Sequence, residues 1–376
     1  MYVLVFHSGQ AVGAIIFVLG LGTLLPWNFF MTASQVGLVR ERLRVAFSLS
    51  AILLLFSLTA ALVRVPMLPD TFFSVTMATI WFINTFGAVL QGSLFGMVGL
   101  FPPRYSTLFM SGQGLAGIFA AFAMLFSILS ESAALGYFIT PCVATLGTLL
   151  CYLMLPHLSL MHIYVFPFKD MKVLNENPKD LEVNRKFIWE PEENQERSSV
   201  LNVFKKIWLM AACVTCVFAV TLSVFPVITV RVRTVYTDSA AWDKVFTCVC
   251  CFIVFNAMDL VGRSAPSLVQ WPSKESCWFP AAVLSRVVFI PLLMMCNVQN
   301  SRLSVFRHVF RHDAAFVTIM ALFSFSNGYL ASLCMAYAPQ LVRSKDCETA
   351  GSLMTFFLVL GLALGASFSF VLGQLV

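Results

Sequence analysis

The chain has 376 residues, of which 59% are hydrophobic and only 11% are charged, with a net charge of +6. Because a typical soluble domain contains about 25% charged residues, this composition excludes an ordinary soluble protein. Phenylalanine alone occurs 37 times. We therefore expect a polytopic membrane protein that is helical almost throughout.

Runs of about 20 mainly apolar residues are long enough to cross a bilayer as helices. Ten such runs occur, at residues 11–33, 45–65, 72–100, 105–130, 135–155, 205–229, 242–264, 279–298, 314–339 and 349–373. Five runs precede a segment of mixed charges and five follow it, and such a segment cannot supply an apolar core. The pattern predicts an N-terminal helical bundle at 1–156, a charged cytoplasmic linker at 157–204 and a C-terminal helical bundle at 205–376.

The distribution of Lys and Arg predicts the orientation. When charges near the ends of a run are counted with the adjacent connection, the odd-numbered connections hold 16 of these residues and the even-numbered ones hold 7, while Arg286 lies deeper inside a run. Since cytoplasmic loops carry the excess of positive charge, the odd connections are expected to be cytoplasmic. With ten spans, both termini would then lie outside.

The first run contains Pro26 beside Trp27 and Asn28. A proline in a spanning helix frees a backbone carbonyl and bends the helix, as happens near binding sites in transporters. A tryptophan at the membrane interface is the alternative interpretation. The residues alone favour neither.

Glycine steps in the middle runs indicate close helix packing. Residues 111–117 contain a formal GxGxxG, but no strand precedes it, so a dinucleotide site fails its context test. Gly92 with Gly96 and Gly361 with Gly365 form GxxxG steps, which let helix backbones approach. These glycines argue for a tight bundle and not for chemistry.

Several polar side chains lie at membrane depth, where each needs a partner because lipid offers none. They are Asn84, Gln91, Gln113, Asn256, Ser324, Ser326 and Asn327. For any one of them an interhelical hydrogen bond is at least as good an explanation as ligand contact. Gln91 stands out because it sits in mid-run between Gly87 and Gly92.

An acid and a base lie four residues apart in the seventh run, as Asp259 and Arg263. On a helix this spacing places both on one face, with the acid on the N-terminal side. Each charge alone costs about 2.5–3.5 kcal/mol in a bilayer on insertion scales, so the pair is expected to face a polar cavity. The pair is a candidate substrate site, and a purely structural ion pair is the alternative.

Signatures of catalysis are missing from the sequence. There is no Walker loop, HExxH or GxSxG, and no paired carboxylates occur in a run. The eleven cysteines lie mostly inside the runs, where a thiol behaves as a small hydrophobe, and no matching histidines complete a metal set. We expect no enzyme, no metal and no cofactor.

Short motifs in a fixed order resemble the equilibrative nucleoside transporter family across nearly the whole chain. They are Leu25 to Asn28, Leu90 to Gly96, Ser111 to Gly117, Asp259 with Gly262 to Ser264, Ser326 to Leu330, and Glu348 to Gly351. The resemblance implies an all-α fold related to the major facilitator superfamily and facilitated diffusion of nucleosides and nucleobases. The implied partners are these solutes and the lipid bilayer, and no nucleic acid.

The resemblance also implies roles for particular residues. Trp27 and Gln91 would contact the nucleobase, and Asp259 and Arg263 would bind the ribose hydroxyls. An aromatic face can stack on a base, and a carboxylate accepts from a hydroxyl. Polar positions near the cytoplasmic gate would be Asn28, Arg44, Asn256 and Glu348, and positions toward the outer gate would be Met31 and Pro226.

One departure from the family concerns its eleven spans, with the N-terminus inside and a long outer loop after the first. Here Met31 to Gln35 runs almost directly into Arg44, where the family's third helix would begin, so the outer loop and second helix are absent and ten spans remain. Removing one span inverts the alternation, which leaves the orientation of residues 1–28 open. We expect a multi-pass protein of the plasma membrane, with an intracellular membrane as the alternative location. The rival functional hypothesis is a non-transporting isoform that associates with a full-length transporter.

Overall fold

The computed structural model describes residues 38–62, 68–99, 103–129, 134–154, 199–236, 240–298 and 312–375, together with Phe310. Within these residues every regular element is a helix, and pairing between extended segments is limited to two isolated bridges. The first predicted span at 11–33 lies outside the described residues. So does the linker as far as residue 198.

The described part of the N-terminal half contains four helices, namely α2 (Leu38–Leu62), α3 (Pro69–Val98), α4 (Pro103–Leu129) and α5 (Ala134–Met154). Both α3 and α4 begin with a proline, which fits the first turn because its missing N–H would have no partner in the helix there. Threonine and serine hydroxyls in these apolar helices donate to the carbonyl four residues earlier, as Thr59, Thr79 and Thr85 do. Such back-bonding satisfies a hydroxyl at membrane depth without a second helix.

The helices of the C-terminal half are interrupted more often than those of the N-terminal half in the described residues. They are α8 (Val200–Val224), α9 (Ala240–Phe246), a π-helix η3 (Thr247–Ile253), α10 (Val254–Ser264), α11 (Trp278–Ser285), α12 (Phe289–Met294), α13 (Asp313–Tyr337) and α14 (Cys347–Leu375). Helix α8 ends where Phe225 adopts an extended conformation before Pro226, since the residue before a proline is disfavoured in the helical region.

Helices occupy all nine predicted runs that fall in the described residues. Seven are long and apolar enough to cross a membrane, and Pro141–Met154 and Trp278–Met294 are shorter apolar helices. The run at 242–264 is built from α9, η3 and α10 in succession. The prediction of an all-α polytopic membrane protein is confirmed.

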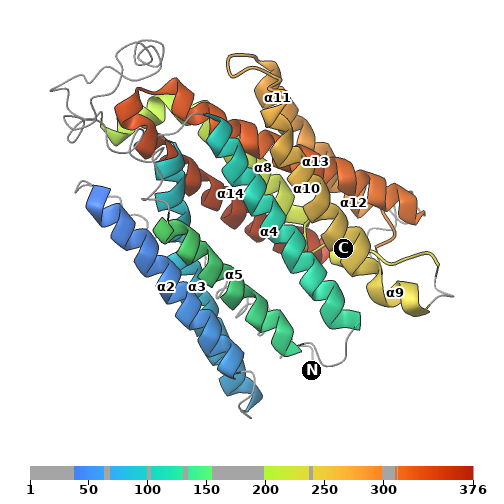
Figure 1. Cartoon of the computed structure of the whole chain (residues 1–376). Coiled ribbons are helices and arrows are strands. Elements are labelled where there is room, and N and C mark those ends of the chain that lie inside the picture. The colour runs from blue at the N-terminus through green and yellow to red at the C-terminus, as the bar shows by residue number, and fades with distance from the viewer. Residues whose placement is uncertain are drawn as a thin grey trace.

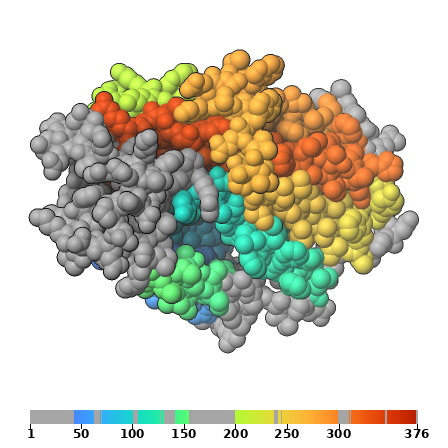
Figure 2. Space-filling view, turned by 45° about the horizontal axis from the view of Figure 1, so that its top comes forward, coloured from blue at the N-terminus to red at the C-terminus, as the bar shows by residue number. Residues whose placement is uncertain are grey.

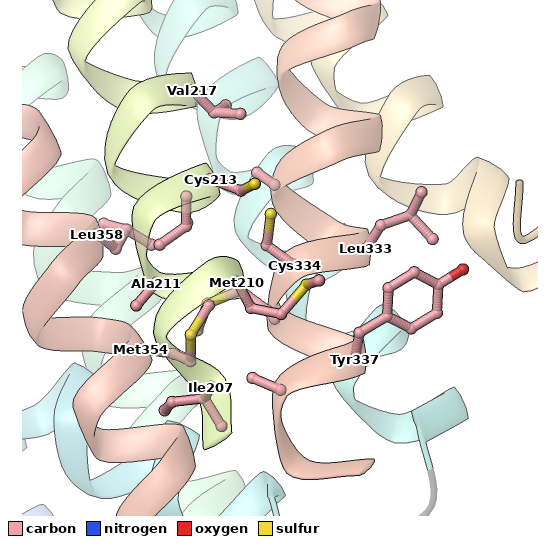
Figure 3. Close-up of a cluster of buried hydrophobic side chains, with 14 of the residues drawn as sticks. Ile207, Met210, Ala211, Cys213, Val217, Leu333, Cys334, Tyr337, Met354 and Leu358 are labelled. Atoms are coloured by element: carbon pink, nitrogen blue, oxygen red, sulfur yellow. The ribbon is translucent and has the colours of Figure 1, made fainter. Parts of the chain in front are cut away.

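The main core lies between α8, α13 and α14. Figure 3 shows Cys213 of α8 near Cys334 of α13, with Met354 and Leu358 of α14 on the other side of α8. Helix α14 also approaches α8 closely through the second GxxxG step. A Cβ on Gly361 would lie 2.5 Å from the carbonyl oxygen of Thr215, and one on Gly365 would lie 2.5 Å from that of Ala219, so the expectation of close packing at this step is confirmed.

In the described residues, the two halves of the chain meet where α4 packs on α10 and α13 and where α3 packs on α14. Helix α4 packs more extensively against α10 and α13 than against α3 or α5, and α14 packs along α3. Figure 1 shows α4 beside α10, and Figure 2 shows the surface of α4 bordering that of the C-terminal helices. The division into bundles at 1–156 and 205–376 remains a prediction.

Candidate functional site: a buried polar network on α10

The predicted charge pair is formed on α10. Nε of Arg263 lies 2.6 Å from Oδ2 of Asp259, and their side chains are only 12% and 5% exposed. The spacing of four residues places both on one helical face, as the sequence predicted. At this depth the ion pair is shielded from water, so its geometry depends on the helices around it.

The second carboxylate oxygen of Asp259 is held from α13. Nδ2 of Asn327 donates to Oδ1 over 2.7 Å. Two glycines make this approach feasible: a Cβ on Gly262 would strike the carbonyl oxygen of Phe325, and one on Gly328 would strike the carbonyl oxygen of Asp259 itself. Because α10 and α13 are in backbone contact here, the short amide of Asn327 can reach the carboxylate.

Helix α4 is the third helix that contributes side chains to the network, after α10 and α13. Nη1 of Arg263 lies 3.3 Å from Oε1 of Gln113 and 4.0 Å from Sδ of Met110. The hydroxyls of Ser264 and Ser111 are 3.0 Å apart, and a Cβ on Gly114 would be 3.0 Å from Cα of Leu260. The glycine-rich motif of α4 therefore packs on α10, and Arg263 bonds to residues from both halves of the chain.

A fully buried arginine extends the network away from α4. Arg286, 1% exposed, donates through Nη2 to Oγ1 of Thr221 over 3.0 Å. Oγ1 of Thr221 lies 2.7 Å from Oδ1 of Asn327. A continuous set of hydrogen bonds thus joins Arg286 to Asp259 through two polar side chains.

Sequence reasoning missed Arg286 as a site residue. Its charge inside an apolar run is the signal that could have found it, because charges within the membrane are costly. Gln113 and Asn327 were recognised as polar groups at membrane depth, but not as partners of Arg263 and Asp259. Their pairing depends on contacts between helices that are distant in sequence.

The remaining predicted residues fall in different places. Trp27, Asn28 and Met31 lie outside the described residues. Gln91 is half-buried on α3, whose main contacts are with α2 and α14, whereas α10 packs mainly on α13 and α4. Within the described residues, then, Gln91 and Asp259 lie on helices that do not pack extensively together.

The predicted gate residues are also dispersed. Arg44 is half-buried on α2, and Pro226 follows the end of α8. Asn256 lies one turn before Asp259, donates to the carbonyl of Phe252 over 2.8 Å and faces Gly117 of α4. Glu348, in the first turn of α14, lies against Gly96 of α3.

The network offers hydrogen-bonding chemistry. The carboxylate of Asp259 keeps lone pairs beyond the two bonds already made, so it can accept from hydroxyl groups, and the guanidinium of Arg263 can donate. In the described part of the chain no group of three or more His, Cys, Asp or Glu side chains is placed to hold a metal ion. Such a site can recognise a polar solute inside an apolar bundle.

Comparison with known proteins places the chain among transporters. The family model "Nucleoside transporter" matches residues 77–374. The chain is 45% identical to equilibrative nucleoside transporter 2 of Mus musculus over 445 positions, covering 97% of each protein. It is 40% identical to equilibrative nucleoside transporter 1 of Homo sapiens, covering 98% of each, and 28% identical to equilibrative nucleoside transporter 3 of Rattus norvegicus, covering 94% of this chain and 86% of the relative.

Proposed function

Because this chain belongs to the nucleoside transporter family, we propose that it carries nucleosides across a membrane by facilitated diffusion and that the α10 network forms part of the solute pathway. Its relatives are named as transporters, and the chain is not an enzyme. The observation that carries the proposal is the buried pair of Asp259 and Arg263, held by side chains from α4 and α13. A costly charge pair at membrane depth is expected where a polar solute must be bound.

In this proposal the carboxylate of Asp259 accepts from the ribose hydroxyls while Arg263 donates to the ribose. Trp27 and Gln91 contact the nucleobase. The guanidinium of Arg263 donates both to the solute and to Gln113, whose side-chain carbonyl oxygen lies 3.3 Å from Nη1. The contact between α4 and α10 then links solute binding to the interface between the two halves of the chain.

Alternating access supplies the transport step. Opening and closing of one bundle against the other around a fixed site is the usual mode for such folds. Asn28, Arg44, Asn256 and Glu348 would act at the cytoplasmic side, and Met31 and Pro226 toward the outside. The contact of Glu348 with Gly96 supports a role at the α3–α14 interface.

Nucleobases are included as solutes, and the plasma membrane is the proposed location. A free nucleobase lacks ribose, so it would depend on the base contacts and not on Asp259. The rival hypothesis of a non-transporting isoform gains no support from the comparisons. The alignment has 445 positions and is therefore longer than this chain, so the relative contains segments that have no counterpart here. The aligned region nevertheless extends over 97% of each protein.

Proteoliposomes containing the purified chain test the proposal. We expect saturable uptake of radiolabelled uridine that stops at equal concentrations, and faster uptake when unlabelled uridine is preloaded inside. Protein-free vesicles and the Asp259→Ala variant are the controls. Accumulation above equilibrium, or uptake no greater than in protein-free vesicles, would refute facilitated diffusion.

A further inference from the structure

We propose that Arg286, Thr221 and Asn327 form a directional relay of hydrogen bonds that positions the carboxylate of Asp259 and so sets the preference for solutes with ribose hydroxyls. This inference rests on the proposed function. All four residues, Asp259 included, are at most 4% exposed. The three relay bonds measure 3.0 Å from Arg286 to Thr221, 2.7 Å from Thr221 to Asn327, and 2.7 Å from Asn327 to Asp259.

The chemistry of the groups fixes the direction of every bond. A guanidinium only donates, so Oγ1 of Thr221 must accept from Arg286. A carboxylate only accepts, so the Asn327 amide must turn its nitrogen toward Asp259 and its oxygen toward Thr221. The single hydroxyl proton of Thr221 therefore points to Asn327. Each donor in the relay faces toward Asp259.

Arg286 is anchored independently of the relay. Nη1 donates to the carbonyl of Val217 over 2.7 Å, Nη2 also lies 3.3 Å from the carbonyl of Phe323, and Nε donates to Oγ of Ser326 over 3.1 Å. The guanidinium lies 5.2 Å from the centre of the Phe323 ring. Bonds to α8 and α13 hold the cation in place, so it does not depend on direct contact with Asp259.

A competing acceptor for Thr221 is already occupied. The threonine hydroxyl lies 2.8 Å from the carbonyl of Val217 on its own helix, the usual back-bonding geometry. Nη1 of Arg286 supplies that carbonyl with a donor at 2.7 Å. That carbonyl therefore has a donor without the threonine hydroxyl, whose proton also has Oδ1 of Asn327 within reach at 2.7 Å. Arg286 is thus a positioning residue in two ways. It donates to the hydroxyl of Thr221, and it also donates to the Val217 carbonyl, the other acceptor near that hydroxyl.

The relay has a consequence for solute selectivity. With Oδ1 held by Asn327 and Oδ2 held by Arg263, the plane of the Asp259 carboxylate is fixed and its unused lone pairs have defined directions. Ribose 2′ and 3′ hydroxyls can use these lone pairs, whereas a solute without them gains nothing from the alignment. Disrupting the relay should therefore weaken binding of ribonucleosides selectively.

The test measures the KM for uridine and the inhibition constant of 2′,3′-dideoxyuridine against uridine uptake in proteoliposomes. For Thr221→Val, which keeps the side-chain shape and removes the hydroxyl, we expect the KM for uridine to rise roughly five- to tenfold, the loss of about one hydrogen bond. The inhibition constant of dideoxyuridine should change less than about twofold, since that solute cannot use the lost alignment. Thr221→Ser should restore the wild-type ratio of the two constants.

The matched control is Thr215→Val on the same helix. Thr215 also bonds to its own helix and across to another, donating to the carbonyls of Ala211 and Phe357, but it is not part of the relay. In Thr215→Val the ratio of the KM for uridine to the inhibition constant of dideoxyuridine should stay at the wild-type value. If Thr221→Val does not fold, Thr221→Cys replaces it, because a thiol is a weak donor.

The possible outcomes separate the relay from the proposed function. An unchanged ratio in Thr221→Val, or an equal change in Thr215→Val, overturns the relay while leaving uridine transport intact. Absence of uridine uptake by the wild-type chain overturns the proposed function instead. A ratio of the KM for uridine to the inhibition constant of dideoxyuridine that rises in Thr221→Val and returns to the wild-type value in Thr221→Ser supports the relay.

Discussion

Arg263 on α10 donates to Gln113 on α4 over 3.3 Å, so a charged residue of the C-terminal half holds an amide of the N-terminal half. The same guanidinium is ion-paired to Asp259 at 2.6 Å. Any movement of α4 away from α10 must break the first bond and can leave the second intact.

Removing one or both charges distinguishes a transport site from a structural ion pair. Asp259→Ala leaves Arg263 buried without its counter-charge, which should cost about 3–5 kcal/mol of stability. The double variant with Asp259→Leu and Arg263→Met removes both charges and should recover most of the thermal stability. Uridine uptake should stay absent in both variants. Melting curves in detergent and vesicle uptake measure the two effects, and wild-type uptake by the double variant would assign the pair a structural role alone.

Changing Gln113 to an acid tests whether the α4–α10 contact opens during transport. Gln113→Glu gives Arg263 a charged acceptor, and charge-assisted hydrogen bonds are roughly twice as strong as neutral ones. We expect higher thermal stability and a several-fold lower maximal rate of uridine uptake, because the closed contact is harder to break. Asn84→Asp is the matched control, since Asn84 bonds only to the carbonyl of Ile80 on its own helix among the bonds described. A maximal rate unchanged by Gln113→Glu would argue against opening at this contact.

Adding a methyl group at Gly262 should separate α10 from α13. The new Cβ would collide with the carbonyl oxygen of Phe325 and lie 2.9 Å from the amide nitrogen of Tyr329. Backbone atoms cannot move aside as a side-chain tip can, so Gly262→Ala should cost about 1–3 kcal/mol or more and remove the Asn327–Asp259 bond. Gly112→Ala is the control, because among the described residues nothing outside the nearby backbone of α4 lies within 4 Å of its added Cβ. Equal melting temperatures for the two variants would contradict the described packing.

Asp313 at the start of α13 should matter for stability and not for solute binding. Its carboxylate accepts from the hydroxyl of Thr234 at 2.6 Å, the amide of Val235 at 3.0 Å and Nε1 of Trp242 at 3.3 Å. Asp313→Ala removes the acceptor of these three donors. The expected loss of folding stability is about 1–3 kcal/mol for each donor that stays buried without a partner. We expect a lower melting temperature with an unchanged KM for uridine. A raised KM at unchanged stability would place this cluster in the solute pathway.

The helices themselves could be predicted from the sequence because each is coded locally. A run of about 20 apolar residues must form a helix in a bilayer, since only internal hydrogen bonds can satisfy its backbone. The spacing of Asp259 and Arg263 likewise determined their pairing, because residues four apart share a helical face. The GxxxG step at Gly361 and Gly365 correctly indicated close packing, although not that α8 would be the partner.

The partners of each polar side chain could not be predicted in this way. Asn84 and Ser324 bond to carbonyls of their own helices, whereas Asn327 and Gln113 reach across to Asp259 and Arg263. All four look alike in sequence, as polar groups in apolar runs. The difference depends on which helix face meets a neighbour.

The sequence by itself determined that this is an all-α membrane protein of the nucleoside transporter family with an acid–base pair on one helical face. Only the tertiary structure decided that Gln113 and Asn327 complete that pair, and that Arg286 reaches Asp259 through Thr221 and Asn327. The physical reason is the distance along the sequence between the interacting residues. Helix formation and spacing of four residues are local properties, but a hydrogen bond between α8, α10 and α13 requires glycines such as Gly262 and Gly328 to bring distant backbones into contact.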